Sequence, residues 1–133
     1  MAYFAQLDDS NIVLQVLAIE NSDILDGDGN ESEAMGIALC RSFVGASTNW
    51  KQTSYNHRRR GTYAGVGYSY DPAQDIFTQP KPDGCDSWTY NLVKRRWEAP
   101  VPYPNQNEYR DDIAAPPFYT WDEDNRRWNQ ETE

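Results

Sequence analysis

The sequence has few of the residues from which catalytic and metal sites are usually built. Among its 133 residues there are one histidine, His57, and two cysteines, Cys40 and Cys85. Two thiols are too few for a disulfide framework or a four-ligand zinc site, and Cys40 lies in an apolar stretch where a reduced, packed thiol is the usual state. We therefore expect cytosolic synthesis, no disulfide, no metal and no cofactor.

Aliphatic residues and long apolar runs are also scarce. Only 22 of the 133 residues are Ile, Leu, Val or Phe, and chains of such composition with a net charge of −9 often fail to fold alone. Aromatic residues, 14% of the chain, supply other apolar surface. The longest apolar run, residues 12–19, is too short to cross a bilayer, and the first residues lack the pattern of a secretion signal. We expect a soluble protein with a thin core, no membrane partner, and some order that depends on partner chains.

Basic residues are few, with 12 Lys and Arg against 21 Asp and Glu. Because nucleic-acid binding depends on neutralising phosphates with Lys and Arg, nucleic acid is excluded as an expected partner. His57 lies beside three arginines, whose charge disfavours its protonation, and no nucleophile, base or nucleotide-binding motif accompanies it. We expect no catalytic residue and no enzymatic activity.

The residues that are present first predict a hairpin. Residues 2–19 contain two apolar segments separated by turn-forming residues 8–11. The second segment, residues 12–19, is almost continuously apolar, so we expect it to be buried on both faces, in the middle of the sheet or under a helix. Further on, the alternating residues 50–55 and the glycine-spaced aromatic run 63–70 both predict strands.

One helix is predicted, over residues 31–44. Asn30 can cap its amino end, Glu33 three positions later completes a capping box, and Gly45 can end it. Its apolar side chains gather on one arc, which we expect to pack on the sheet: Met35, Leu39, Cys40 and Phe43. The predicted fold class is α+β, with a small antiparallel sheet and one helix in a domain of residues 1–80.

A weak internal repeat occupies the rest of the chain. Residues 69–77, 89–97 and 120–128 align without gaps, and each has an aromatic residue, then Asp or Asn, and a second aromatic residue seven positions after the first. The Asx side chain can stabilise a turn, so that the two rings pair across short strands. Prolines between the segments favour stiff, extended linkers. We expect proline-spaced aromatic hairpins, two of them in an extended arm of residues 81–133.

Two groups of side chains are candidate partner-binding residues. Arg58, Arg59 and Arg60 can pair with an acidic patch on a neighbouring copy, or form a solvated turn. The tryptophans of the second half can anchor a partner or pair within the hairpins, and an exposed ring can also stack on a carbohydrate: Trp88, Trp97, Trp121 and Trp128. Isolated hairpins are marginal in water, so they need support from the amino-terminal domain or from another protein.

Several segments are similar to a group of small proteins: residues 1–8, 11–13, 49–56, 63–71, 80–82 and 120–128. Over nearly its whole length the chain resembles uncharacterised virion-associated proteins of tailed cyanophages and other marine bacteriophages. The resemblance implies a virion setting and supplies no catalytic residues.

The leading hypothesis is a non-enzymatic bacteriophage virion structural protein, made in the host cytoplasm, that binds other virion proteins and copies of itself. Under this hypothesis the protein is either an accessory or decoration component of the capsid or a component associated with the tail. The alternative is a host-receptor or glycan-binding module of a tail fibre or tail tip. A small hydrolase or a phage-encoded regulator made in the infected cell is a third reading.

Overall fold

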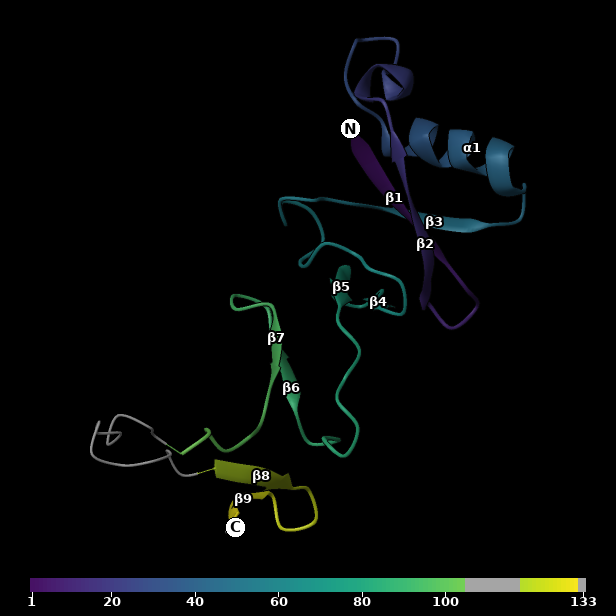
Figure 1. The fold of residues 1–133 in the computed structure, drawn as a ribbon. Helices are drawn as coiled ribbons and strands as arrows, with labels where there is room; N and C mark the ends of the chain where they lie inside the picture. The colour runs from purple at the N-terminus through teal and green to yellow at the C-terminus, as the bar shows by residue number, and fades with distance from the viewer. Residues whose placement is uncertain (105–117, 132–133) are drawn as a thin grey trace. The chain divides into compact units, whose positions relative to one another are not determined.

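The computed structural model describes residues 1–104 and 118–131 (Figure 1). The chain divides into two compact units, Met1–Pro80 and Lys81–Glu133. One helix, a three-stranded antiparallel sheet and three separate hairpins confirm the α+β class predicted from the sequence. Within the described residues, no helix is both long enough and apolar enough to cross a membrane.

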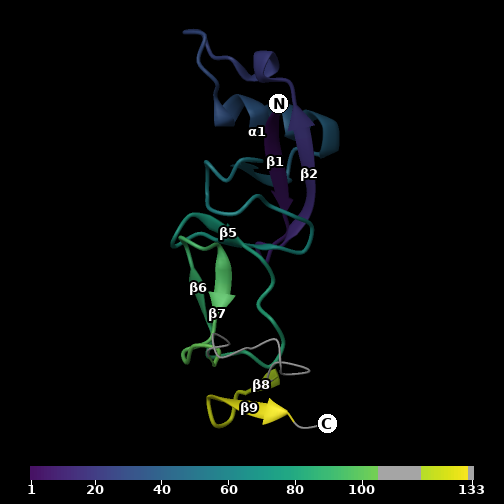
Figure 2. The same ribbon diagram turned by 60° about the vertical axis from the view of Figure 1, so that its left-hand side comes forward.

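The sheet of the first unit is built on a hairpin, as predicted. Its strands are hydrogen-bonded in the order β2-β1-β3, with bounds β1 Ala2–Leu7, β2 Val13–Ile19 and β3 Asn49–Thr53. Figure 2 shows β1 and β2 side by side. In the turn between β1 and β2, Asp8 Oδ1 accepts hydrogen bonds from the N–H groups of Ser10 (2.8 Å) and Ile12 (2.9 Å). The Asx side chain thereby closes the turn that joins the two strands.

The central strand is β1, so residues 12–19 do not lie in the middle of the sheet, and the predicted burial of both their faces was wrong. Phe4 of β1 packs in one buried cluster with Cys40 of the helix, and Ala5 packs in a second cluster with Phe77 on the opposite face. In β2 only the two end residues are buried, and Leu14 is 49% exposed. An apolar run shows that a strand can be buried; which strand has neighbours on both edges depends on long-range pairing.

Helix α1 (Glu33–Val44) is capped by Ser32 rather than by Asn30. Ser32 Oγ accepts from the N–H of Met35 at 3.3 Å, and at the other end the N–H of Gly45 donates to Arg41 O at 2.9 Å. A short 3₁₀ helix, η1 (Asn21–Ile24), precedes α1. The cap is therefore two positions later than predicted, which places Glu33 at the first position of the helix.

The face of α1 that packs on the sheet agrees with the prediction in part, because Leu39 and Cys40 pack in the cluster that contains Phe4 but Met35 and Phe43 do not. Gly36 and Cys40 are buried, whereas Met35 and Phe43 are 43% and 66% exposed. A Cβ atom at Gly36 would lie 2.0 Å from Cζ of Phe4, so the glycine is what admits the Phe4 ring to the helix surface. Because the helix contacts the Phe4 ring at Gly36, the side chains of Met35 and Phe43 point away from the sheet.

The aromatic run 63–70 is mostly turn rather than strand, which corrects a further prediction. Its only strand residues belong to β4 (Ser69–Asp71), which pairs with β5 (Ile76–Thr78). Gly67 has a left-handed φ of 87°, which β strands do not use, and its N–H donates to Val13 O at 2.9 Å. The glycine therefore bends the segment at the start of β2.

The second unit contains the two remaining hairpins. Their strands are β6 Thr89–Asn91, β7 Arg96–Glu98, β8 Phe118–Asp122 and β9 Arg127–Glu131. Together with β4–β5, these hairpins confirm the repeat found in the sequence.

Candidate functional site

Each hairpin holds two aromatic residues directly opposite one another on its two strands. The pairs are Tyr70 with Phe77, Tyr90 with Trp97, and Trp121 with Trp128. Their ring centroids are 5.3, 5.3 and 5.1 Å apart, the spacing at which edge-on or tilted rings attract. The second aromatic residue of each repeat is therefore the cross-strand partner of the first.

The turn of each hairpin depends on its Asp or Asn. In β6–β7, Asn91 Oδ1 accepts hydrogen bonds from the N–H groups of Val93 (3.0 Å) and Lys94 (2.9 Å). The last turn residue of each hairpin is left-handed, with φ between 49° and 54°: Asp75, Arg95 and Arg126. Asx side chains and one left-handed residue together reverse the chain within four residues.

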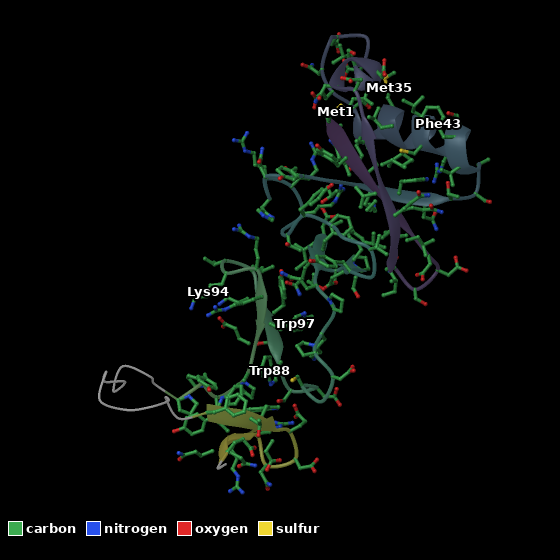
Figure 3. The ribbon with its side chains drawn as sticks, viewed as in Figure 1. Met1, Met35, Phe43, Trp88, Lys94 and Trp97 are labelled. Carbon is green, nitrogen blue, oxygen red and sulfur yellow. The ribbon has the colours of Figure 1, made fainter. Side chains whose placement is uncertain are left out.

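In the second unit, five rings gather in one group, which we call the aromatic cluster: Trp88, Tyr103, Tyr119, Trp121 and Trp128. Neighbouring ring centroids are 4.9–5.9 Å apart and all are edge-on. Three of the four tryptophans predicted to bind partners are thus brought together. The fourth, Trp97 (labelled in Figure 3), pairs with Tyr90. The Lys81 ammonium lies 5.0 Å from the ring centroid of Trp97.

Hydrogen bonds tie the aromatic cluster to the proline-rich segment before it. Trp128 Nε1 donates to the carbonyl of Val101 at 2.8 Å, and the N–H of Tyr119 donates to the hydroxyl of Tyr103 at 3.3 Å. These contacts hold the residues after β7 against the β8–β9 hairpin.

A single carboxylate, that of Glu123, connects the hairpin to the residues that precede β6. It accepts hydrogen bonds from the N–H (3.0 Å) and hydroxyl (2.9 Å) of Ser87 and from Trp121 Nε1 (3.0 Å). These donors, the Ser87 N–H first, lower the pKa of Glu123. The residues before β6 are therefore tied to the β8–β9 hairpin by polar contacts as well as by rings.

A cavity of about 630 Å³ lies beside the aromatic cluster. Trp88, Trp97, Tyr103 and Trp128 line it, as do three charged side chains, Lys94, Arg96 and Glu98. Trp88 Nε1 is buried and has no hydrogen-bond partner among the described residues. A hollow with aromatic walls and a few charged groups suits the recognition of an apolar group that carries a polar end.

The second unit buries this aromatic surface only in part. Among its described residues, Cys85 alone is buried, Tyr103 is 41% exposed, and the other four rings of the cluster are half-buried. The rings therefore cover one another only in part, and the cluster keeps apolar surface in contact with solvent.

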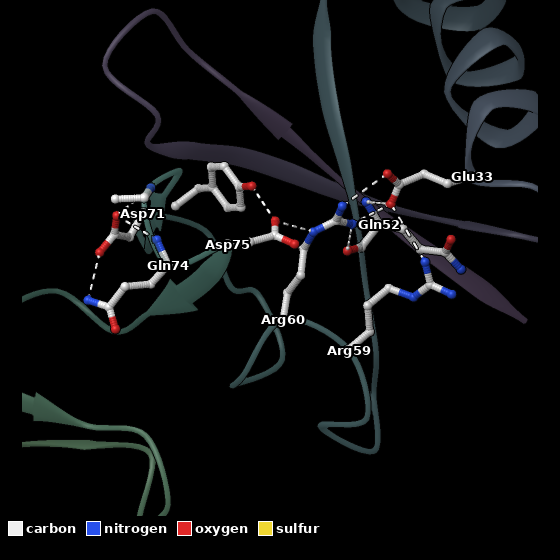
Figure 4. A network of polar contacts seen from close by, with 9 residues as sticks. Glu33, Gln52, Arg59, Arg60, Asp71, Gln74 and Asp75 are labelled. Atoms are coloured by element: carbon white, nitrogen blue, oxygen red, sulfur yellow. Dashed lines mark hydrogen bonds and ion pairs between the residues drawn. The ribbon is translucent and has the colours of Figure 1, made fainter.

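The three candidate arginines lie in the first unit, and Figure 4 shows that Arg60 and Arg59 both reach the carboxylate of Glu33. The side chain of Arg60 is 13% exposed; Nε donates to Asp75 at 2.7 Å, Nη1 and Nη2 donate to Glu33, and Nη1 also donates to Gln52 O at 2.9 Å. Arg59 is 48% exposed and 3.8 Å from the same Glu33 carboxylate.

The two carboxylates around Arg60 are shifted toward their charged forms, and the phenol of Tyr70 is shifted toward its neutral form. Burial alone raises the pKa of Glu33, but the hydrogen bonds and charge of Arg60 outweigh it and lower the pKa. Hydrogen bonds from Tyr70 and Arg60 lower the pKa of Asp75. Burial, and then the hydrogen bond to Asp75, raises the pKa of Tyr70 to about 12. These contacts stabilise the fold, and the charged groups of Arg60, Glu33 and Asp75 already have one another as hydrogen-bond and ion-pair partners.

Sequence reasoning missed several members of these groups. Glu33 and Asp75 are 27 and 15 residues from Arg60, and no local pattern joins residues so far apart. Tyr103 and Tyr119 stand outside the aligned aromatic positions of the repeat. The Pro-Tyr-Pro segment around Tyr103 was the one available signal, because prolines hold a ring in an extended, exposed position.

Comparisons with known proteins do not assign the chain to a family. Within the described ranges 1–104 and 118–131, no three His, Cys, Asp or Glu side chains lie together as metal ligands would. No family model matches the chain, and no curated protein or solved structure was found to be similar to it. What the protein does has to be inferred from its own residues.

Proposed function

We propose that the protein is a non-enzymatic structural component of a bacteriophage virion, and that its aromatic cluster binds neighbouring capsid or tail subunits. One observation carries the proposal: the rings of the cluster stay partly exposed beside a cavity of about 630 Å³. Tryptophan and tyrosine are enriched at the centres of protein interfaces, where a few rings supply most of the binding energy. The virion setting is supported by the resemblance of the sequence segments to proteins of marine phages.

Binding proceeds by burial of ring surface that the unit leaves exposed. An apolar side chain of the partner enters the cavity and removes Trp97, Tyr103 and Trp128 from water, which contributes about 25 cal/mol for each Å² of apolar surface. The charged residues beside the rings orient the partner. Arg96 Nε is 3.2 Å from Glu98 Oε1, so both signs of charge are present at one side of the cavity.

Incorporation into particles tests the proposal. Trp128→Ala removes a ring of the cluster, and Arg96→Glu reverses a charge beside the cavity at a side chain that is 62% exposed. Both should reduce the number of copies in purified particles, measured by quantitative mass spectrometry, by about ten-fold or more. Phe43→Ala, which removes an exposed ring of the first unit, is the control and should be incorporated normally.

Two results would contradict the proposal. Normal incorporation of both cluster variants would exclude the aromatic cluster as the binding surface. Absence of the wild-type protein from particles would exclude the virion role and favour a function in the infected cell. If particles incorporate the cluster variants normally but adsorb poorly to host cells, the result would instead support a role in receptor binding.

A further inference from the structure

A second cavity, of about 470 Å³, lies in the first unit at one end of its sheet. At this end β1 begins, while β2 and β3 both end, because Ala2 pairs with Ile19 and Tyr3 pairs with Thr53. Residues that follow β2 and residues that follow β3 therefore flank the start of β1 on opposite sides. Since neighbouring strands are about 4.8 Å apart, the two flanks are about 10 Å apart.

One flank of the cavity carries two arginines with unused hydrogen-bonding capacity. Arg58 and Arg59 line the cavity, and Arg58 has no ion-pair partner among the residues that the structure describes. The nearest acid to Arg59 is Glu33, at 3.8 Å, and this carboxylate already accepts two hydrogen bonds from Arg60. The guanidinium groups can therefore still bind an anion.

The loop that carries these arginines is held in place by its backbone. Its flanking residues His57 and Arg60 are left-handed, with φ of 58° and 55°. His57 Nδ1 accepts from the N–H of Tyr63 at 3.0 Å, and the carbonyl of Arg60 accepts from the N–H of Phe77 at 2.9 Å. A loop fixed at both ends presents its two arginines without a large ordering cost.

The opposite flank presents an acceptor rather than a cation. Asn21 and Glu31 line it, and Asn21 Nδ2 donates to Glu31 Oε1 at 2.5 Å, which leaves the second carboxylate oxygen as an acceptor. The aromatic wall of the cavity includes Tyr3 of β1 and Tyr55, which follows β3, and the ring centroids of these two residues are 6.2 Å apart. The Tyr55 side is open to solvent, with 64% of the residue exposed.

These three surfaces define a ligand with an anionic end, an apolar face and hydroxyl donors. Phosphate has no apolar face to pack on a ring, and an acidic peptide side chain has no hydroxyl to donate to Glu31, so neither matches all three surfaces. A neutral sugar fits the ring and Glu31 but leaves both arginines without an anion. An acidic sugar satisfies all three surfaces, and a cavity of this volume is within the range of about 300–1,000 Å³ typical of small-ligand sites.

We propose that this cavity binds a uronate residue of an acidic polysaccharide. Its carboxylate pairs with Arg58 and Arg59, its C–H face packs on Tyr55, and a hydroxyl donates to Glu31. The site is made of residues of the first unit alone and does not depend on the aromatic cluster or on the function proposed for it.

Titration of the full-length protein with galacturonate disaccharide, followed by ¹⁵N NMR, tests the site. Amide signals of Tyr3, Tyr55 and the loop of residues 57–60 should shift, with a dissociation constant in the millimolar range or lower. The methyl ester of the same disaccharide keeps the ring but not the charge, so it should bind at least about ten-fold more weakly. Inorganic phosphate and a glutamate oligopeptide should bind more weakly than the uronate.

Matched variants assign the effect to the cavity. Arg58→Gln combined with Arg59→Gln should weaken uronate binding at least about ten-fold, because each guanidinium makes a hydrogen bond to a charged group. Arg126→Gln with Arg127→Gln removes the same charge from the β8–β9 turn and should leave binding unchanged. Tyr55→Ala, at an exposed ring, should also weaken binding, and an unshifted indole signal of Trp50 shows that each variant is folded.

Several outcomes would overturn the proposal. Equal binding of the acid and its methyl ester would exclude the arginine contact. If the Arg58/Arg59 and Arg126/Arg127 double variants lose the same amount of uronate affinity, the loss would be a non-specific effect of net charge. Tighter binding of phosphate or of the glutamate peptide would show that the cavity prefers a bare anion or a protein partner, and no binding of the uronate would exclude the site.

Discussion

Replacement of Glu33 by glutamine removes the charge that holds Arg60 while it preserves the shape of the side chain. The carboxylate is 24% exposed and accepts hydrogen bonds from two nitrogens of Arg60 and from the N–H of Gln52 at 3.1 Å. A hydrogen bond to a charged group is worth about 1.5–3 kcal/mol, and Asp75 continues to compensate Arg60. We expect Glu33→Gln to lower the free energy of unfolding of the first unit by about 2 kcal/mol, or its Tm by about 10 °C.

Urea unfolding followed at the Trp50 indole N–H measures this loss in the first unit alone. Trp50 is the single tryptophan before residue 81, it is 3% exposed, and its Nε1 donates to Thr48 Oγ1 at 2.7 Å. Glu20→Gln changes an exposed carboxylate by the same charge and should cost less than about 0.5 kcal/mol. Equal stability of the two variants would refute the importance assigned to the ion pair.

The same ion pair makes stability depend on pH. Because the pKa of Glu33 in the folded protein lies below its ordinary value of 4.5, the unfolded chain binds more protons in the interval between the two values. The stabilisation is complete above the ordinary pKa and is lost as the pH falls through the folded pKa. The difference between wild type and Glu33→Gln should therefore shrink from pH 7 to about pH 3. A difference independent of pH would contradict an electrostatic origin.

Two further predictions concern packing and turns. Gly36→Ala places a methyl group against the Phe4 ring and should destabilise the first unit by about 1–3 kcal/mol in urea unfolding, whereas Gly27→Ala, with no atom within 4 Å of its new Cβ, should be nearly neutral; equal effects would contradict the close packing. Asn91→Ala removes the side chain that closes the β6–β7 turn and should speed amide exchange in that hairpin by about five-fold or more, whereas Leu92→Ala in the same turn should not. Equal exchange in both variants would exclude the Asx contact.

The features that could be predicted from the sequence are those determined within a few residues. The aromatic residues and the Asx residue of each hairpin lie within nine positions, so their spacing alone indicated both the turn and the ring pair. The hairpin of residues 2–19 was found for the same reason, because turn formers separate two adjacent apolar segments.

The features that could not be predicted depend on contacts between distant residues. The packing face of α1 is determined by the contact of Gly36 with Phe4, 32 positions earlier in the chain, and an apolar arc drawn on the helix alone does not contain that information. Likewise, β1 became the central strand because β3 pairs with its free edge. Among the candidate site residues, each tryptophan could be named from the sequence, but the contact of Trp128 with Tyr103 could not be predicted from it.

The closure of each ring pair within nine residues has a consequence for how this chain can change over generations. Among the described residues, no strand of one hairpin is hydrogen-bonded to a strand of another, so the pairing register of each is set within its own short cassette of sequence, although its rings also pack on other parts of the same unit. Duplication or loss of one cassette leaves the pairing register of every other strand intact. A second copy of β6–β7 can therefore be added to the chain without a change in the strand pairing of the amino-terminal sheet.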